Sequence, residues 1–415
     1  MATIKPFKGI RPKTELASQV AALPYDVYNS AEARAAVAKN PLSFLNIDRA
    51  ETQFPDGTSP YLPEVYEKAR DLFWSQVKDG LYIQDEKPCY YVYELIMDGR
   101  SQVGLVACAS IDDYQNEIIK KHENTRAEKE IDRIKHVGVM EAQTGPIFLA
   151  YRFNETIDKE IQKARANAPL YDFTCDDGVT HRAWLIDNET SVNIIRKAFE
   201  GMKDIYIADG HHRCASAVKV GLRLREENPG YTGEEEFNFF LSVLFPDEQL
   251  MIMDYNRVVK DLNGLSEEEF LQKVEKIYTV KELGSEYVKP SKKGEVAMLL
   301  SDTWYLLTVR PEYTSVDPIQ GLDVSILQNN VLSPVLGITD PKTDDRIDFV
   351  GGIRGYEELK KRVHTDCKAA FGMYPTSIHE LFDVADAHLL MPPKSTWFEP
   401  KLRSGLFIHS IKKEN

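Results

Sequence analysis

Five consecutive residues with functional side chains lie between a strand-like and a helix-like segment: Asp209, Gly210, His211, His212 and Arg213. Residues 204–208 are mostly apolar and β-favouring, and the apolar residues from 211 to 227 have helical spacing. Glycine permits a tight turn and close approach of the backbone. Free amides and the dipole at a helix N-terminus attract anions, and arginine can bind phosphate through two nitrogens. The pattern therefore predicts an anion site.

Asp209 is the unusual member of this turn, because its carboxylate repels phosphate. Three roles stay open for it: capping the helix, holding Mg²⁺, or orienting a histidine. The alternative for the whole turn is an ordinary helix start with two surface histidines. A zinc site is disfavoured, because adjacent helical residues point ~100° apart and no third ligand follows at zinc spacing. Cys214 is either a nucleophile near the helix N-terminus or a small buried residue.

A second candidate segment is highly charged. Residues 115–137 are predicted to form one long helix that includes His122 and Glu123. Glu123, Arg126, Glu130 and Arg133 fall at offsets 0, 3, 7 and 10, which is one narrow helix face. This face is either solvated and crossed by ion pairs or part of a polar cleft. In a cleft, Glu123 beside His122 has the chemistry of a general base.

Composition restricts the classes of partner. The chain has 51 Lys and Arg against 65 Asp and Glu, and the resulting net charge of −14 disfavours nucleic acid as a partner. We expect no membrane span and no signal peptide, because long apolar runs are absent. The cysteines are far apart and form no CxxC motif, which indicates a reduced, cytoplasmic location. They are Cys89, Cys108, Cys175, Cys214 and Cys367.

The elements that must position these residues alternate irregularly. Residues 90–96 and 103–111 read as strands, with Asp98 and Gly99 as the turn of a hairpin. Strands and helices interleave without a regular βαβ rhythm, so we predict an α+β (mixed α/β) fold. No linker marks a boundary. We expect an N-terminal α/β region at 1–112, a core carrying both charged motifs at 113–260, and a C-terminal α/β region at 261–415.

Several short motifs support a family resemblance. The whole chain is similar to a bacterial and archaeal family known as domain of unknown function 1015. The turn at 209–213 resembles the phosphate-binding turn of the ParB/sulfiredoxin superfamily, and within it that of the free-serine kinases, which phosphorylate L-serine with ADP or ATP. Those kinases also carry a His-Glu pair upstream, as His122 and Glu123 do here. The segments that carry the family resemblance are 7–12, 24–27, 122–125, 145–149, 209–213, 332–338 and 391–396.

The resemblance implies a ParB/sulfiredoxin-like nucleotide-binding core with large additional α/β elaborations. It implies a small-molecule kinase that uses ATP or ADP and Mg²⁺, with L-serine as the expected acceptor. The alternative is a non-catalytic nucleotide-binding regulator. Sulfinic-acid repair is disfavoured, because sulfiredoxins have a cysteine where His211 stands here. A ParB-type DNA clamp is disfavoured, because no helix-turn-helix is found.

The resemblance also implies residue roles. Glu123 would take the proton from the acceptor hydroxyl, with His122 beside it, and Asp209 would stand near Mg²⁺ or the hydroxyl. Gly210, His211, His212 and Arg213 would hold the nucleotide phosphates. Further candidates for contacts with substrate or phosphate are Arg126, Lys394, Ser395 and Thr396.

Overall fold

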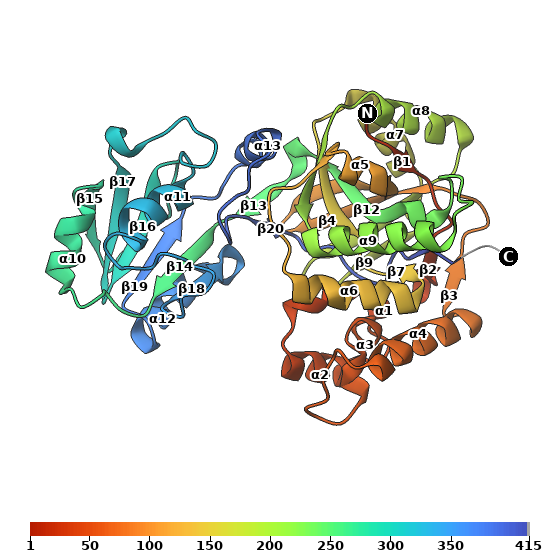
Figure 1. Ribbon diagram of the computed structural model, residues 1–415, viewed down its shortest axis with the longest axis horizontal. Coiled ribbons are helices and arrows are strands. Elements are labelled where there is room, and N and C mark those ends of the chain that lie inside the picture. The colour runs from red at the N-terminus through yellow and green to blue at the C-terminus, as the bar shows by residue number, and fades with distance from the viewer. Residues whose placement is uncertain (413–415) are drawn as a thin grey trace. The chain divides into compact units, whose positions relative to one another are not determined.

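The computed structural model describes residues 1–412, and its contacts divide the chain into two units (Figure 1). The first unit comprises Met1–Leu250 together with the segment from Pro400 onward, and the second comprises Met251–Glu399. The second unit is therefore inserted between two parts of the first. We call residues 400–412 the return segment. Both units combine sheets and helices, and the predicted α+β class is confirmed.

A nine-stranded mixed sheet forms the centre of the first unit, in the order β6-β11-β8-β12-β5-β4-β10-β9, with β1 also pairing with β5. Its strands are β1 (Ile4–Lys5), β4 (Tyr90–Met97), β5 (Arg100–Ser110), β6 (Ile119–Lys120), β8 (Ile147–Tyr151), β9 (Tyr171–Thr174), β10 (Thr180–Ile186), β11 (Ile205–Asp209) and β12 (Phe239–Pro246). The expected regions 1–112 and 113–260 both contribute strands to this sheet.

The predicted hairpin is confirmed as β4 and β5, which pair antiparallel. Asp98 and Gly99 have φ values of 52° and 77°, the left-handed conformation that a two-residue type I′ turn needs. Side chains alternate between the two sheet faces. Tyr90 and Val92 join the core beneath the helices.

Helices cover one face of this sheet in successive layers. Helices α5 (Ile111–Gln115), α7 (Glu155–Arg165), α8 (Glu189–Glu200) and α9 (His211–Glu227) bury apolar side chains in the sheet's core. Helix α6 (Ala127–Met140) packs between α9 and α4 (Pro63–Lys78) (Figure 1). The N-terminal layer around α4 also contains α1 (Ala17–Val20), α2 (Ser30–Lys39) and α3 (Leu45–Asp48). Because α6 is covered on both sides, even its charged residues Asp132 and Arg133 are buried.

The prediction of a single helix at 115–137 is wrong. The chain forms α5, the short strand β6 and then α6, which begins only at Ala127. Pairing of β6 with β11 keeps Ile119 and Lys120 extended. His122 and Glu123 therefore lie in a loop before the helix, and Glu123 and Arg126 are not on a helix face with Glu130.

Two further strand pairs attach the ends of the chain to the first unit. β2 (Ile10–Pro12) pairs with β3 (Tyr82–Gln84), and β21 (His409–Ser410) pairs with β7 (Ala142–Gln143). Isolated bridges join Ile408 to Ile10 and Ser404 to Ala22. The return segment is thus built into the first unit.

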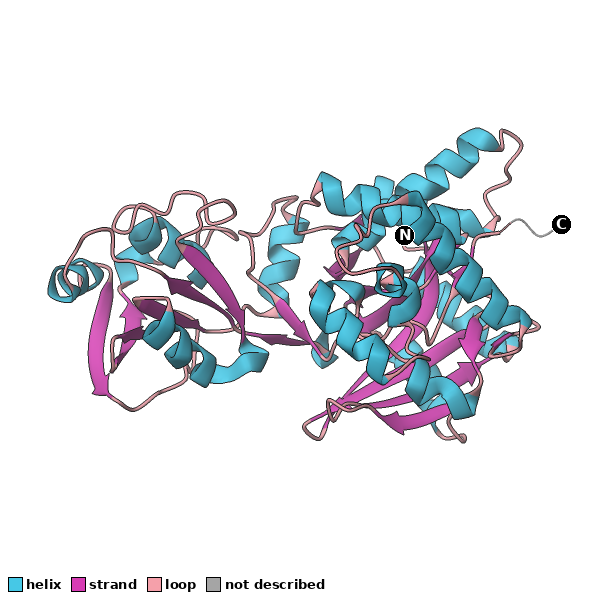
Figure 2. Ribbon diagram, turned by 90° about the horizontal axis from the view of Figure 1, so that it is seen from below, coloured by secondary structure: helices cyan, strands magenta, loops and turns pink. Residues whose placement is uncertain are grey.

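The second unit contains a six-stranded antiparallel sheet in the order β15-β17-β16-β19-β14-β18. Its strands are β13 (Met251–Met253), β14 (Tyr255–Val259), β15 (Tyr278–Gly284), β16 (Glu295–Leu300), β17 (Thr303–Val309), β18 (Ile347–Gly351), β19 (Ala369–Met373) and β20 (Trp397–Glu399), of which β13 and β20 form a separate ribbon. Its helices are α10 (Glu267–Val274), α11 (Asp323–Leu327), α12 (Gly355–Thr365) and α13 (Ile378–Asp386). Figure 2 shows the strands and helices of the chain in different colours.

Candidate functional site

The anion-binding turn predicted at 209–213 has the expected local geometry. β11 ends at Asp209 and α9 begins at His211, with Gly210 between them at φ 93°. This is a backbone conformation that glycine adopts readily and other residues rarely do. The Asp209 carboxylate accepts a hydrogen bond from the Gly210 amide at 2.9 Å, and no side chain caps α9. The first-turn amides of α9 are thus left uncapped by side chains, as a site for an anion requires.

Arg213 folds back over this turn. Its Nη1 donates to the Pro146 carbonyl at 2.5 Å, which fixes the guanidinium against the loop before β8. A Cβ added at Gly210 would lie 3.0 Å from Arg213 Nη2. The glycine therefore serves both the backbone turn and the position of the arginine.

Lys401 is a member of the site that the sequence did not reveal. Its Nζ lies 3.2 Å from the second carboxylate oxygen of Asp209. Burial raises the pKa of Asp209, but the Lys401 and Arg213 cations outweigh it and hold that pKa well below its usual range. Asp209 is consequently ionised and already neutralised, which removes the objection that it would repel phosphate. No local pattern marks Lys401, because it comes from the return segment, 192 positions along the chain.

Two histidines of the turn bind the loop that carries Glu123. The His122 amide donates to His211 Nε2 at 3.4 Å, and the Arg126 amide donates to His212 Nε2 at 2.9 Å. Burial lowers the pKa of His122 to about 4 and lowers the pKa values of both turn histidines. Both turn histidines are therefore neutral and accept at Nε2, so only their Nδ1–H groups are available to donate to an anion.

The structure brings some predicted site residues together and leaves others separate. His122 and Arg126 lie against α9 through the two hydrogen bonds above, and the ring centroids of His122 and His211 are 4.4 Å apart. Glu123 lies between them on the exposed side of the loop. Its role as a base stays a prediction.

The other candidates, Lys394, Ser395 and Thr396, belong to the second unit. Ser395 Oγ donates to the Pro392 carbonyl at 2.7 Å, and the Lys394 ammonium lies 5.6 Å from the Tyr255 ring centroid. Both contacts lie within the second unit and stabilise the loop that carries these residues.

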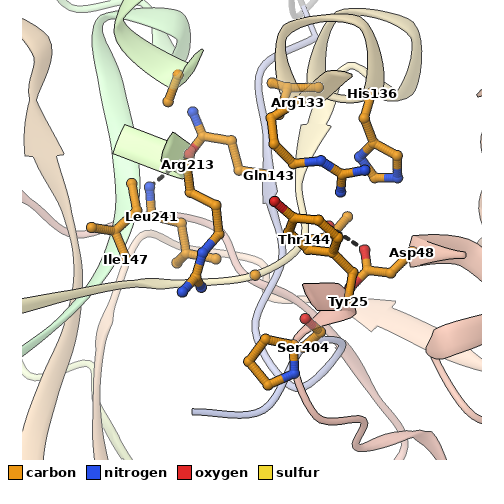
Figure 3. A pocket seen from close by; sticks show the side chains of 14 residues that line it. Tyr25, Asp48, Arg133, His136, Gln143, Thr144, Ile147, Arg213, Leu241 and Ser404 are labelled. Atoms are coloured by element: carbon orange, nitrogen blue, oxygen red, sulfur yellow. Dashed lines mark hydrogen bonds between the residues drawn. The ribbon is translucent and has the colours of Figure 1, made fainter. Parts of the chain in front are cut away.

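A small cavity of about 30 Å³ adjoins the turn, and Arg213 forms part of its wall (Figure 3). Its polar wall also includes Tyr25, Asp48, Arg133 and His136. The Arg133 guanidinium lies 3.8 Å from the Tyr25 ring centroid, and Thr144 donates to Asp48 at 3.0 Å. Asp48 and His136 were not predicted as site residues, since neither belongs to a recognisable motif.

The described residues at the turn offer a metal ion one carboxylate, that of Asp209. Among residues 1–412, no three or more His, Cys, Asp and Glu side chains gather as a metal site would require. Mg²⁺ needs only one or two carboxylates when substrate phosphates supply further ligands. Asp209 fits that lesser role, because it is ionised and lies at the anion turn.

No helix in the described part of the chain has the length and apolar character needed to cross a bilayer.

The chain belongs to the family described as "Protein of unknown function (DUF1015)", whose match covers residues 4–325. This confirms the family resemblance stated from the sequence. The matched range ends within the second unit, so it does not include Lys401.

Solved structures provide the other comparisons. A free serine kinase mutant in complex with ADP has 13% identity and a TM-score of 0.35, and the match covers 73% of this chain and 92% of that one. SbnI from Staphylococcus aureus, with a C-terminal truncation, has 11% identity, a TM-score of 0.40 and coverages of 75% and 90%. A conserved hypothetical protein from Pyrococcus furiosus has 15% identity, a TM-score of 0.35 and coverages of 73% and 94%. No curated protein matches the chain.

Proposed function

We propose that this protein binds a nucleotide at the α9 turn and transfers a phosphoryl group to a small molecule, with L-serine as the first acceptor to test. The observation that carries the proposal is the convergence of Gly210, Arg213 and Lys401 on the uncapped N-terminus of α9. Phosphoryl transfer depends mainly on positioning and on neutralising charge. This turn offers both.

Each residue has a definite part in the proposal. The first-turn amides of α9 and the Arg213 guanidinium hold the phosphates of ATP or ADP. Asp209 supplies one carboxylate to Mg²⁺, which when bound neutralises phosphate charge. Glu123 accepts the proton of the acceptor hydroxyl, and the His211 and His212 contacts keep its loop against the turn.

The direct experiment is incubation with radiolabelled ATP or ADP and a panel of amino acids, read by thin-layer chromatography. Glu123→Gln keeps the shape and removes the basicity, so turnover should fall roughly 10²–10⁴-fold with nearly unchanged nucleotide affinity. Arg213→Ala should weaken nucleotide binding by roughly 1.5–3 kcal/mol, the scale of a hydrogen bond to a charged group. Glu128→Gln, on the exposed first turn of α6, is the matched control. If the wild-type protein bound no nucleotide, the proposal would be contradicted.

A second candidate is a non-catalytic nucleotide-binding regulator. The observation that favours it is that His211 and His212 already use their Nε2 atoms to hold backbone amides of the 121–126 loop. Binding of a nucleotide at the turn would then change the conformation of the 121–126 loop through these two histidines. Nucleotide binding without any phosphorylated product, and with Glu123→Gln indistinguishable from wild type, would favour this candidate.

A further inference from the structure

A second, larger cavity lies in the first unit between the N-terminal layer and α6. Its volume is about 410 Å³, enough for a small metabolite. It shares Tyr25, Asp48, Arg133 and His136, which Figure 3 labels, with the small cavity that Arg213 lines. The two cavities therefore adjoin. Asp26 and Lys129 also line the larger cavity, and both act electrostatically on His212. The larger cavity is therefore a neighbour of the anion turn.

Most of the buried charge around this cavity is paired. Arg49 Nε lies 2.5 Å from a Glu51 carboxylate oxygen, and Arg133 Nη2 lies 2.7 Å from Asp132. The Tyr66 hydroxyl donates to the other Asp132 oxygen at 2.8 Å. These pairs neutralise one another and keep their own geometry without a ligand.

Asp48 is the exception. It is 6% exposed, and within the described residues its carboxylate has one hydrogen-bond donor, the neutral Thr144 hydroxyl, and no ion pair. Removing one carboxylate from water is costly unless a cation or several donors replace the water. The Arg133 cation acts on Asp48 electrostatically, but within the described residues no cation contacts the Asp48 carboxylate directly.

His136 adds a second unmet acceptor. Its ring is buried, it is hydrogen-bonded to the backbone of Ile47, and its Nε2 has no hydrogen-bond partner among the residues described. Burial and the neighbouring Arg133 lower the pKa of His136 to about 4, so the ring is neutral. A neutral imidazole that donates from one nitrogen accepts at the other. His136 Nε2 thus requires a donor from the cavity, and the Asp48 carboxylate has capacity to accept a further one.

We infer that this cavity binds the acceptor substrate, and that the substrate carries a primary ammonium group held by Asp48 and His136. This inference rests on the proposed kinase function. An ammonium provides three donors and one positive charge, which matches one carboxylate and one imidazole nitrogen.

The test compares ligands that differ only in the inferred group. Binding of L-serine, ethanolamine and glycerate is measured by equilibrium dialysis, with and without ADP. We expect L-serine and ethanolamine to bind and glycerate, which lacks the ammonium, to bind at least 10-fold more weakly. Equal binding of glycerate, or binding of none of the three, overturns the inference.

Two variants localise the binding. Asp48→Asn preserves the shape and the Thr144 contact, and should weaken L-serine binding at least 10-fold without changing ADP binding. His136→Gln should weaken it several-fold. Asp71→Asn, an exposed α4 carboxylate paired with Arg70, is the matched control. Thermal unfolding confirms that each variant is folded.

The two proposals fail differently. If ADP binds normally and Asp48→Asn leaves L-serine affinity unchanged, the inference about this cavity is wrong and the nucleotide site stands. If ADP does not bind to the wild type, the proposed function is wrong, and with it the role of this cavity as an acceptor pocket.

Discussion

At the scale of single residues, the charge balance at Asp209 decides what the turn binds. Asp209 contributes one negative charge, while Arg213 and Lys401 contribute two positive charges that lower its pKa. The local balance is positive, which suits a phosphate group. Of these three residues, the sequence identified Asp209 and Arg213, because they lie four positions apart at one strand-to-helix junction. Lys401 depends on the tertiary fold and has no sequence signal.

Replacing Lys401 tests this balance. In Lys401→Met, Asp209 loses the cation that neutralises its carboxylate, while the carboxylate stays ionised at neutral pH, so its negative charge opposes phosphate. We expect nucleotide affinity to fall roughly 10-fold, about 1.4 kcal/mol, within the range for hydrogen bonds to charged groups. Isothermal titration calorimetry measures it. Lys412→Met, also in the return segment but stacked on Trp74, should have no effect. Equal affinities in the two variants would contradict the assignment.

Cys214 illustrates the opposite case, a reactive residue type without a reactive environment. It is fully buried in the sheet's core, and burial raises its pKa well above the ordinary thiol value. A thiolate is therefore not formed at neutral pH. Cys214→Ala should leave any phosphotransfer rate within a few-fold of wild type in the radiolabel assay. Loss of all activity in a folded variant would revive a thiol mechanism.

At the scale of elements, the loop at 121–126 is the main departure from the sequence-based prediction. The charges at 123, 126, 130 and 133 have helical spacing, but the first two lie before α6. The reason is tertiary: β11 pairs with β6, and the α9 histidines bind amides of the loop. Helix α9 and the β4–β5 hairpin were predictable, because local glycine turns and apolar periodicity define them. A charge pattern alone could not locate the start of α6.

The histidine contacts of the loop can be tested directly. His212→Ala removes the acceptor of the Arg126 amide, so that amide should exchange several-fold faster, as expected for loss of about 1 kcal/mol of hydrogen-bond stability. Hydrogen-exchange mass spectrometry of peptides covering the loop measures the change. His364→Ala, which alters an exposed histidine paired with Asp302, serves as control. Unchanged exchange in His212→Ala would show that other contacts hold the loop.

At the scale of the whole molecule, buried neutral histidines make stability depend on pH. Burial lowers the pKa of His122 and His136 to about 4, and burial together with Arg403 lowers that of His181 to about 3. The unfolded chain binds protons at these residues below about pH 6.5, whereas the folded protein does not. The three histidines therefore leave the free energy of unfolding unchanged above pH 6.5 and reduce it as the pH falls from 6.5 toward 4.

We expect the free energy of unfolding to fall by on the order of 1 kcal/mol per pH unit for each of these histidines between pH 6 and pH 5. Urea unfolding at pH 7, 6 and 5 measures it. His181→Gln should reduce the pH slope even if it lowers stability at pH 7, because one titrating group is removed. A stability that stays constant from pH 7 to pH 5 would contradict this account.

The return segment has a consequence for synthesis. Residues 1–250 are made first, but Lys401, the partner of Asp209, and Ser404, which bridges to Ala22, follow the whole second unit. At roughly 5–20 residues per second, the ribosome spends on the order of 10 s making Met251–Glu399. During that interval β7 lacks its partner strand β21, and the anion turn lacks Lys401. The nascent first unit therefore passes through an incomplete stage in which a chaperone has time to bind it.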